Sequence, residues 1–155
     1  MDTNRVRGFE PVVGAPEDMK MPERSTTNSA GYDFFAAETV TVRPVSYAPS
    51  MRPTLVKTNI KAYMQPDEFL QLCNRSSNPK KGLLMANGVG IVDSDYYSNP
   101  DNDGNIGFIF WNVGDEALVI NKGDKIGQGI FLKYLKTDDD SATGERSGGW
   151  GSTGA

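Results

Sequence analysis

Apolar and polar side chains alternate in several short segments, which predicts a protein built mainly from β-strands. Over residues 56–64 a mostly apolar set alternates with a polar set, and Gln65, Pro66 and Asp67 then form a turn signal before the apolar run at residues 69–73. We therefore expect residues 56–64 and 69–73 to pair as a hairpin.

Four further segments have the composition of strands. Residues 40–42 and 106–113 are rich in β-branched and aromatic side chains, and residues 126–135 follow a turn signal at 121–124. One more strand is expected near residues 7–13. No window sustains a helical period over three turns, so the pattern favours an all-β barrel or sandwich.

A single short segment favours a helical turn. Asn78 is suited to the N-cap, Pro79 to the first helical position and Gly82 to the end of the turn.

The chain has 155 residues, which fits one domain. Residues 97–104 are rich in turn-forming types and predict a loop between strands. From residue 136 the chain becomes polar, acidic and aperiodic, and it ends in a glycine-rich segment. We expect a β-barrel domain over residues 1–135, followed over 136–155 by a flexible tether and a closing arm.

Composition narrows the chemistry. The net charge of −4 argues against attraction to nucleic acid or to an anionic membrane. The N-terminus lacks a signal peptide and Cys73 is the single cysteine, which favours a cytoplasmic protein. The chain contains no histidine, so catalysis must use carboxylates, hydroxyls, Arg, Lys or an oxygen-bound metal such as Mg²⁺.

Two polar clusters follow predicted strands or turns. Asp33 lies among small and aromatic residues, where it could support a metal's water shell or cap a turn. Arg75, Ser76 and Ser77 place one guanidinium and two hydroxyls together, which suits a phosphate group, although a salt bridge beside a capping serine explains them equally well.

Two carboxylates, Asp93 and Asp95, are two residues apart, so on an extended chain they point the same way. Either could act as a general base for water, and a solvated acidic turn is the alternative. Gln128 is a polar residue in an apolar segment, so its amide needs backbone partners or a place in a site.

The C-terminal segment 145–154 combines four glycines, two hydroxyls, Arg146 and Trp150. Glycine amides, hydroxyls and a guanidinium can enclose phosphate groups. A flexible linker has a similar composition, and this segment alone does not separate the two.

Taken in order, five segments resemble the five motifs of the trimeric dUTPase family, the dUTP diphosphatases. The matching segments run from residue 30 to the C-terminus: Ala30-Gly31-Tyr32-Asp33, Arg75-Ser76-Ser77, the stretch from Gly90 to Tyr96, the stretch from Gly123 to Gln128, and Arg146 through Gly154.

The resemblance implies an all-β, jelly-roll-like barrel that forms a homotrimer with active sites shared between subunits. It implies hydrolysis of dUTP to dUMP and diphosphate, which limits uracil incorporation into DNA and supplies dUMP for dTTP synthesis. Asp93 matches the general base that aligns water for attack on the α-phosphorus. Arg146 and Trp150 would act on a neighbouring subunit's Asp93.

The resemblance also implies the contacts to substrate. Tyr96 would pack under the deoxyribose and exclude a 2′-hydroxyl, and Trp150 would stack on uracil. The uracil would be read by residues of a hairpin: Asn87, Gly90, Ile91 and Gly107. The phosphates would be bound by a larger set: Arg75, Ser76, Ser77, Gln128, Arg146, Gly151, Ser152 and Thr153. Asp33 would support, through water, an Mg²⁺ ion held mainly by the triphosphate.

Two alternatives remain open. A dCTP deaminase-type relative would need a glutamate base, and none of the five motifs contains one within it. A regulatory binding protein that retains a dUTPase site is the other alternative, and a regulatory protein partner is compatible with the sequence.

Overall fold

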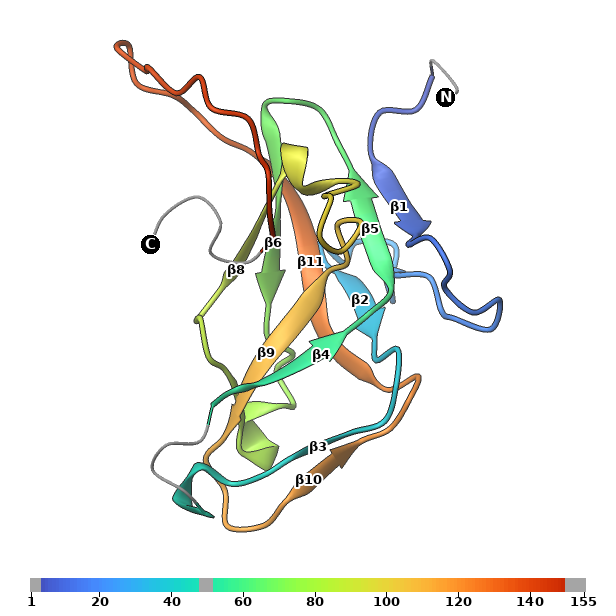
Figure 1. The fold of residues 1–155 in the computed structure, drawn as a ribbon. Coiled ribbons are helices and arrows are strands. Elements are labelled where there is room, and N and C mark those ends of the chain that lie inside the picture. The colour runs from blue at the N-terminus through green and yellow to red at the C-terminus, as the bar shows by residue number, and fades with distance from the viewer. Residues whose placement is uncertain (1–3, 48–51, 150–155) are drawn as a thin grey trace.

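Eleven short strands and three single-turn 3-10 helices form the regular structure of the described residues, 4–47 and 52–149, in the computed structural model (Figure 1). The strands are β1 Gly8–Pro11, β2 Tyr32–Phe35, β3 Val40–Val42, β4 Thr54–Lys57, β5 Ile60–Tyr63, β6 Glu68–Cys73, β7 Leu83–Met85, β8 Gly90–Asp93, β9 Gly107–Asn112, β10 Leu118–Ile120 and β11 Lys125–Lys133. The 3-10 helices are η1 Val45–Tyr47, η2 Pro79–Lys81 and η3 Ser94–Tyr96. No helix in this part of the chain is long and apolar enough to cross a membrane.

The strands form four small antiparallel sheets. The largest has the order β2-β11-β6-β8, and a second has the order β4-β9-β7. The pairs β1-β5 and β3-β10 complete the β-structure. Because the strands are short and change partners, the sheets wrap around one interior (Figure 1).

The core consists of inward-facing apolar residues contributed by both larger sheets. On β6, Leu70 and Leu72 are buried while the intervening side chains are partly exposed, which is the alternation expected of a half-buried strand. Phe34 of β2 and Phe108 of β9 are fully buried, and their ring centroids are 5.5 Å apart. These aromatic contacts join the two sheets across the interior.

Most of the predicted elements are confirmed. Strands occupy the expected segments at the N-terminus, at 40–42 and within 106–113, and β11 covers most of 126–135 but begins one residue earlier. The helical turn begins after Asn78, and Gly82 ends it with φ 89°. The Asn78 side chain, however, does not cap the turn, because its amide donates to Asn74 Oδ1 and to the Ile126 carbonyl.

The predicted hairpin of residues 56–64 with 69–73 is wrong. Asn59 has φ 60°, a left-handed conformation that Asn tolerates better than most residues, and it divides the segment into β4 and β5. β4 then pairs with β9 and β5 with β1, whereas β6 lies between β11 and β8. Apolar and polar side chains alternate without interruption through Asn59, so the sequence pattern did not reveal the break.

We expect Gly127→Ala to destabilise the barrel by about 1–3 kcal/mol because it overpacks the core. Gly127 lies at a bulge in β11, and a Cβ there would collide with the Phe108 ring. Chemical denaturation measures the effect. Gly144→Ala is the matched control, since a Cβ at that position meets nothing within 4 Å. Equal stability of the two variants would contradict this packing.

Candidate active site

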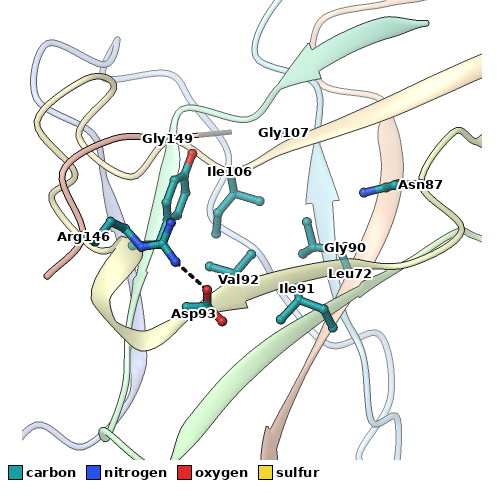
Figure 2. A pocket seen from close by; sticks show the side chains of 11 residues that line it. Leu72, Asn87, Gly90, Ile91, Val92, Asp93, Ile106, Gly107, Arg146 and Gly149 are labelled. Carbon is teal, nitrogen blue, oxygen red and sulfur yellow. Dashed lines mark hydrogen bonds and ion pairs between the residues drawn. The ribbon is translucent and has the colours of Figure 1, made fainter. Parts of the chain in front are cut away.

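A pocket of about 260 Å³ opens where β8 ends (Figure 2). The pocket is lined by the residue that the resemblance assigns as general base, by five that it assigns to uracil and deoxyribose, and by the arm residue Arg146. Apart from Arg146, these residues are Asn87, Gly90, Ile91, Asp93, Tyr96 and Gly107. Apolar walls come from Leu72, Val92 and Ile106, and Gly149 closes one side.

Two glycines shape the pocket wall. A Cβ at Gly90 would lie 3.0 Å from Leu72 Cβ, and one at Gly107 would lie 2.6 Å from Leu55 Cδ1. At both positions the backbone therefore lies so close to a leucine side chain that only glycine fits. Since glycine has no side chain, backbone N–H and C=O groups border the pocket there.

Asp93 and Asp95 both contact the guanidinium of Arg146. Arg146 Nη2 donates to Asp93 Oδ2 at 2.5 Å (Figure 2), and its Nε donates to Asp95 Oδ1 at 2.8 Å. The Arg146 side chain is 11% exposed. Hydrogen bonding to Asp95 is the largest of the effects that raise the pKa of Arg146, and burial opposes it.

The carboxylates of Asp93 and Asp95 lie close together, but not because they alternate on an extended strand as predicted. Asp93 is the last residue of β8 and Asp95 lies in η3, so the chain is not extended through both. The turn into η3 brings the second carboxylate beside the first. One cation thus bridges two carboxylates at the pocket rim and offsets one of their two negative charges.

The hydroxyl of Tyr96 is fixed by two hydrogen bonds. It donates to the Asn105 carbonyl at 2.8 Å and accepts from Asn102 Nδ2 at 2.8 Å. The ring is therefore a firm wall of the pocket, since rotation would break both bonds.

Five more of the predicted residues, Asp33, Arg75, Ser76, Ser77 and Gln128, lie on or next to other strands of the four-stranded sheet. Gln128 lies between Cys73 and Asp33 in the strand register, and its Nε2 donates to the Asn74 carbonyl at 3.2 Å. The partner required by this amide is thus a backbone group.

Lys125 connects the charged members of this second group. Its Nζ lies 3.4 Å from Asp33 Oδ2, and its carbonyl accepts from Arg75 Nη1 at 3.2 Å. Ser76 is exposed and Ser77 is half-buried in the turn that follows Arg75.

The register separates the two groups. Asp93 is opposite Phe69 on β6, whereas Gln128 is opposite Cys73. Four residues of strand correspond to about 13 Å, and the two intervening strand spacings add about 9–10 Å across the sheet. The single chain therefore keeps the Asp93 group apart from the Gln128 and Asp33 group.

Sequence reasoning missed the contacts around residues 97–104. This loop was predicted as a connection, yet Asn99 and Asp101 bind the arm and Asn102 binds Tyr96. Its density of Asn and Asp next to Tyr96 was the available signal. Four predicted residues lie outside the described part of the chain: Trp150, Gly151, Ser152 and Thr153.

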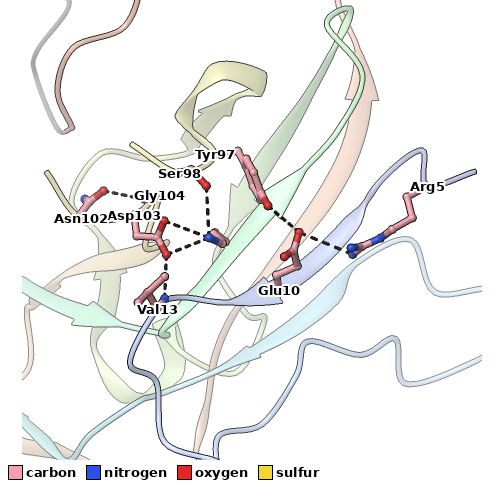
Figure 3. Close-up of polar contacts among 9 residues, drawn as sticks. Arg5, Glu10, Val13, Tyr97, Ser98, Asn102, Asp103 and Gly104 are labelled. Carbon is pink, nitrogen blue, oxygen red and sulfur yellow. Dashed lines mark hydrogen bonds and ion pairs between the residues drawn. The ribbon is translucent and has the colours of Figure 1, made fainter. Parts of the chain in front are cut away.

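The same loop is anchored to the barrel by a buried cation. Lys61 Nζ contacts both Asp103 carboxylate oxygens at 3.0 Å, and Asp103 Oδ2 also accepts from the Val13 amide at 2.8 Å (Figure 3). Hydrogen bonding from the Val13 amide, with support from Lys61, lowers the pKa of Asp103 against the opposing effect of burial. Tyr97 donates to Glu10 at 2.8 Å and joins the loop to β1.

Comparison with known proteins identifies the family of this chain. The model of the dUTPase family matches residues 17–154. The deoxyuridine 5'-triphosphate nucleotidohydrolase of Lactococcus lactis is 48% identical, over 97% of this chain and 99% of its own length. The chain belongs to the dUTPase family.

Other members show the same relationship. The Mus musculus deoxyuridine 5'-triphosphate nucleotidohydrolase is 33% identical over 92% of this chain and 83% of its own length. The crystal structure of dUTPase from Streptococcus mutans has a TM-score of 0.77 and 39% identity, covering 84% of this chain and 98% of that one. The fold is thus the β-rich, jelly-roll-like barrel of the dUTPase family, as the resemblance predicted.

A more distant structure shares the fold. It is a mutant dUTPase from phage phi11 of S. aureus, which coordinates a structural Mg(II) ion. It is 21% identical, with a TM-score of 0.68, and covers 89% of this chain and 97% of that one.

We expect Asp103→Asn to destabilise the protein by about 1–3 kcal/mol at pH 7, because it leaves the Lys61 ammonium buried without its anionic partner. The folded-state pKa of Asp103 lies below the unfolded value, so the stabilisation is present above about pH 4 and is lost as the pH falls through the folded pKa. Denaturant titrations from pH 7 to pH 3 should show the two proteins converging.

Asp18→Asn is the control for that comparison. Asp18 pairs with Lys122 at the surface, where both side chains are largely exposed, so its loss should change stability little. A stability difference for Asp103→Asn that stays constant with pH would contradict the ion-pair explanation.

Proposed function

We propose that this chain hydrolyses dUTP to dUMP and diphosphate at a site built around the Asp93 pocket. The proposal rests on that pocket. In this member of the dUTPase family, the Asp93 carboxylate, the fixed Tyr96 ring and the glycine backbone line one cavity. This activity limits uracil incorporation into DNA and supplies dUMP for dTTP synthesis.

In the proposed mechanism Asp93 accepts a proton from a water molecule. The water oxygen bonds to the α-phosphorus as the bond from that phosphorus to the bridging oxygen of the β-phosphate breaks, and diphosphate leaves. Asp93 is half exposed at the rim, so water can reach its free oxygen. A positioned carboxylate is the general base that suits a chain with no histidine.

Arg146 occupies one oxygen of Asp93 in the free protein. A triphosphate offers the guanidinium several anionic oxygens, and bidentate phosphate contacts compete well with a partly exposed carboxylate. We infer that Arg146 exchanges Asp93 and Asp95 for the γ-phosphate when substrate binds. The exchange frees the base and neutralises the leaving group together.

Specificity for deoxyuridine follows from the rigid parts of the pocket. Tyr96 is held by two hydrogen bonds, so its ring cannot yield to a 2′-hydroxyl. Backbone groups at Gly90, Ile91 and Gly107 would pair with uracil, and Asn87 would support them. A fixed backbone edge rejects a base with a different donor pattern because polar groups would remain unpaired.

The second group of residues suits the phosphates. Arg75, Ser76, Ser77 and Gln128 supply donors, and Asp33 supplies an oxygen ligand of the kind that Mg²⁺ prefers. Lys125 lies 3.4 Å from Asp33, which fits contact through the ion's water shell better than a direct ligand. Bound with the triphosphate, Mg²⁺ would neutralise charge on the phosphate oxygens. A structural Mg(II) ion in the phage phi11 protein supports the presence of a metal in this family.

Separation of the two groups supports a homotrimer with shared sites, because a neighbour can place its own phosphate-binding group beside Asp93. Ile91 and Leu132 on the outer face of the four-stranded sheet are 55% and 41% exposed. An exposed apolar sheet face of this kind suits contact with another subunit.

We also propose the division into a barrel, residues 1–135, and an arm, 136–155. Residues 136–145 are exposed throughout, and Figure 1 shows this stretch extending away from the barrel before it returns. The arm lies on its own Asp93 here, and a neighbour's arm can make the same contact by exchange. Trp150, Gly151, Ser152 and Thr153 would complete closure over uracil and the γ-phosphate. The proposed location is the cytoplasm.

We expect Asp93→Asn to abolish hydrolysis of dUTP while nucleotide binding is largely retained, because the amide keeps the shape and loses the base. Diphosphate release and calorimetric binding of dUTP measure the two effects. Asp115→Asn, an exposed aspartate remote from the pocket, is the matched control. Full activity in Asp93→Asn would refute the mechanism.

We expect diphosphate release from dUTP to exceed release from dCTP, dTTP and UTP by about a hundredfold or more. Cytosine would leave polar groups unpaired, the 5-methyl group of thymine would collide with the backbone that reads the base, and the 2′-hydroxyl of UTP would meet the Tyr96 ring. Removal of Mg²⁺ with a chelator should lower the rate on dUTP. Comparable rates on the four nucleotides would contradict the assignment of the pocket.

A further inference from the structure

The loop at residues 97–104, here named the docking loop, is a rigid extension of the barrel. Lys61, Asp103 and Tyr97 anchor it through the contacts shown in Figure 3. Gly104 has φ 77°, and a Cβ there would lie 2.6 Å from the Tyr96 carbonyl oxygen. The loop is therefore closed tightly on the segment that carries Tyr96.

The docking loop holds the arm at two consecutive residues. Asn99 Nδ2 donates to the Gly148 carbonyl at 2.6 Å, and the Gly149 amide donates to Asp101 Oδ2 at 3.0 Å. Asn99 is 3% exposed, and Gly148 is buried against it. Residues 136–145 are exposed, so the described arm returns to the barrel at 146–149.

Asn99 has two separable functions. Its Oδ1 accepts from the Asp101 amide at 3.0 Å and shapes the loop, whereas its Nδ2 binds the arm. Gly148 is two residues from Arg146, so the Asn99 contact fixes the backbone that carries the guanidinium. Asn102 lies beside Gly149 and also donates to the Tyr96 hydroxyl, so the docked arm rests on the same unit as the tyrosine.

We propose that Asn99 is a positioning residue for hydrolysis, which docks the arm at Gly148 and thereby delivers Arg146 to the pocket. The proposal rests on the proposed function, because it assigns a role in that reaction. It holds whether the docked arm belongs to the same subunit or to a neighbour, since the contacting groups are identical.

The test uses Asn99→Asp in the full-length protein. Aspartate keeps an Oδ1 acceptor for the Asp101 amide and replaces the donor with a carboxylate oxygen against the Gly148 carbonyl. We expect kcat/KM for dUTP to fall at least tenfold, since loss of one buried hydrogen bond with a new repulsion costs a factor of about ten or more. Asn99→Ala should give a loss in the same direction.

A second readout follows the arm without using activity. An arginine-specific protease should release residues 147–155 faster from Asn99→Asp than from the wild type, because Arg146 is 11% exposed when docked. This measurement separates the two proposals. A wild type that does not hydrolyse dUTP refutes the proposed function, while an unchanged cleavage rate refutes docking by Asn99.

Asn112→Ala is the matched control. Asn112 is fully buried and also donates to backbone carbonyls, those of Val42 and Glu116, which are remote from the arm. It should lower the melting temperature while leaving both release of residues 147–155 and kcat/KM at wild-type values. Equal losses of kcat/KM in Asn99→Ala and Asn112→Ala would show that Asn99 is merely structural and overturn the proposal.

A double-mutant cycle with Arg146→Ala completes the test. If Asn99 acts by delivering Arg146, Asn99→Asp should change kcat/KM little in the Arg146→Ala background. Fully additive losses would overturn the proposal. So would faster cleavage of the arm combined with wild-type kcat/KM.

Discussion

The pairing register of β6 with its two neighbours determines how this protein can form a site. β6 places Asp93 opposite Phe69 on one side and Gln128 opposite Cys73 on the other, four residues further along the strand. A shift by one residue would turn Asp93 toward the core, because successive side chains alternate between faces. The buried row on β6 prevents that shift, so the separation of the two groups is as stable as the core itself.

Charge placement follows from the same geometry. The chain is acidic overall, yet its proposed ligand is a polyanion, so cations must be concentrated locally. Arg146 is brought to Asp93 and Asp95 by the arm, and Lys125 stands beside Asp33 in the second group. Each cation is paired with a carboxylate in the free protein, and each can be redirected when phosphate oxygens enter. Electrostatic preorganisation of this kind limits the cost of binding a triphosphate.

Local features of the fold were accessible from the sequence, and features that depend on distant contacts were not. The strand within 106–113 and the helical turn after Asn78 follow from composition and turn chemistry within a few residues. The break at Asn59 was missed because side-chain alternation continues through it while the backbone φ changes sign. Partner choice, such as β6 with β11 instead of β5, depends on the packing of the whole barrel.

The site, too, has parts that the sequence predicted and parts that depend on distant contacts. The resemblance assigned Asp93 and Tyr96 through the third motif and Gly107 through the uracil contacts, and the structure places these three in one pocket. The sequence did not reveal that Asn99 binds Gly148, because a hydrogen bond across 49 residues leaves no periodic trace. Convergence of Asp95 on Arg146 depends on the turn into η3, which simple alternation does not describe.

Subunit mixing tests most directly whether the active site is assembled between chains. Asp93→Asn and Arg75→Ala subunits, each inactive alone, would be co-expressed with different tags, and oligomers that contain both would be purified. If the two groups come from different subunits, each mixed trimer has one intact site of three, so the purified mixed oligomers should show about a third of the wild-type dUTP hydrolysis. Activity no greater than that of the two parents would contradict the account, because it would mean that one chain supplies both groups to its own site.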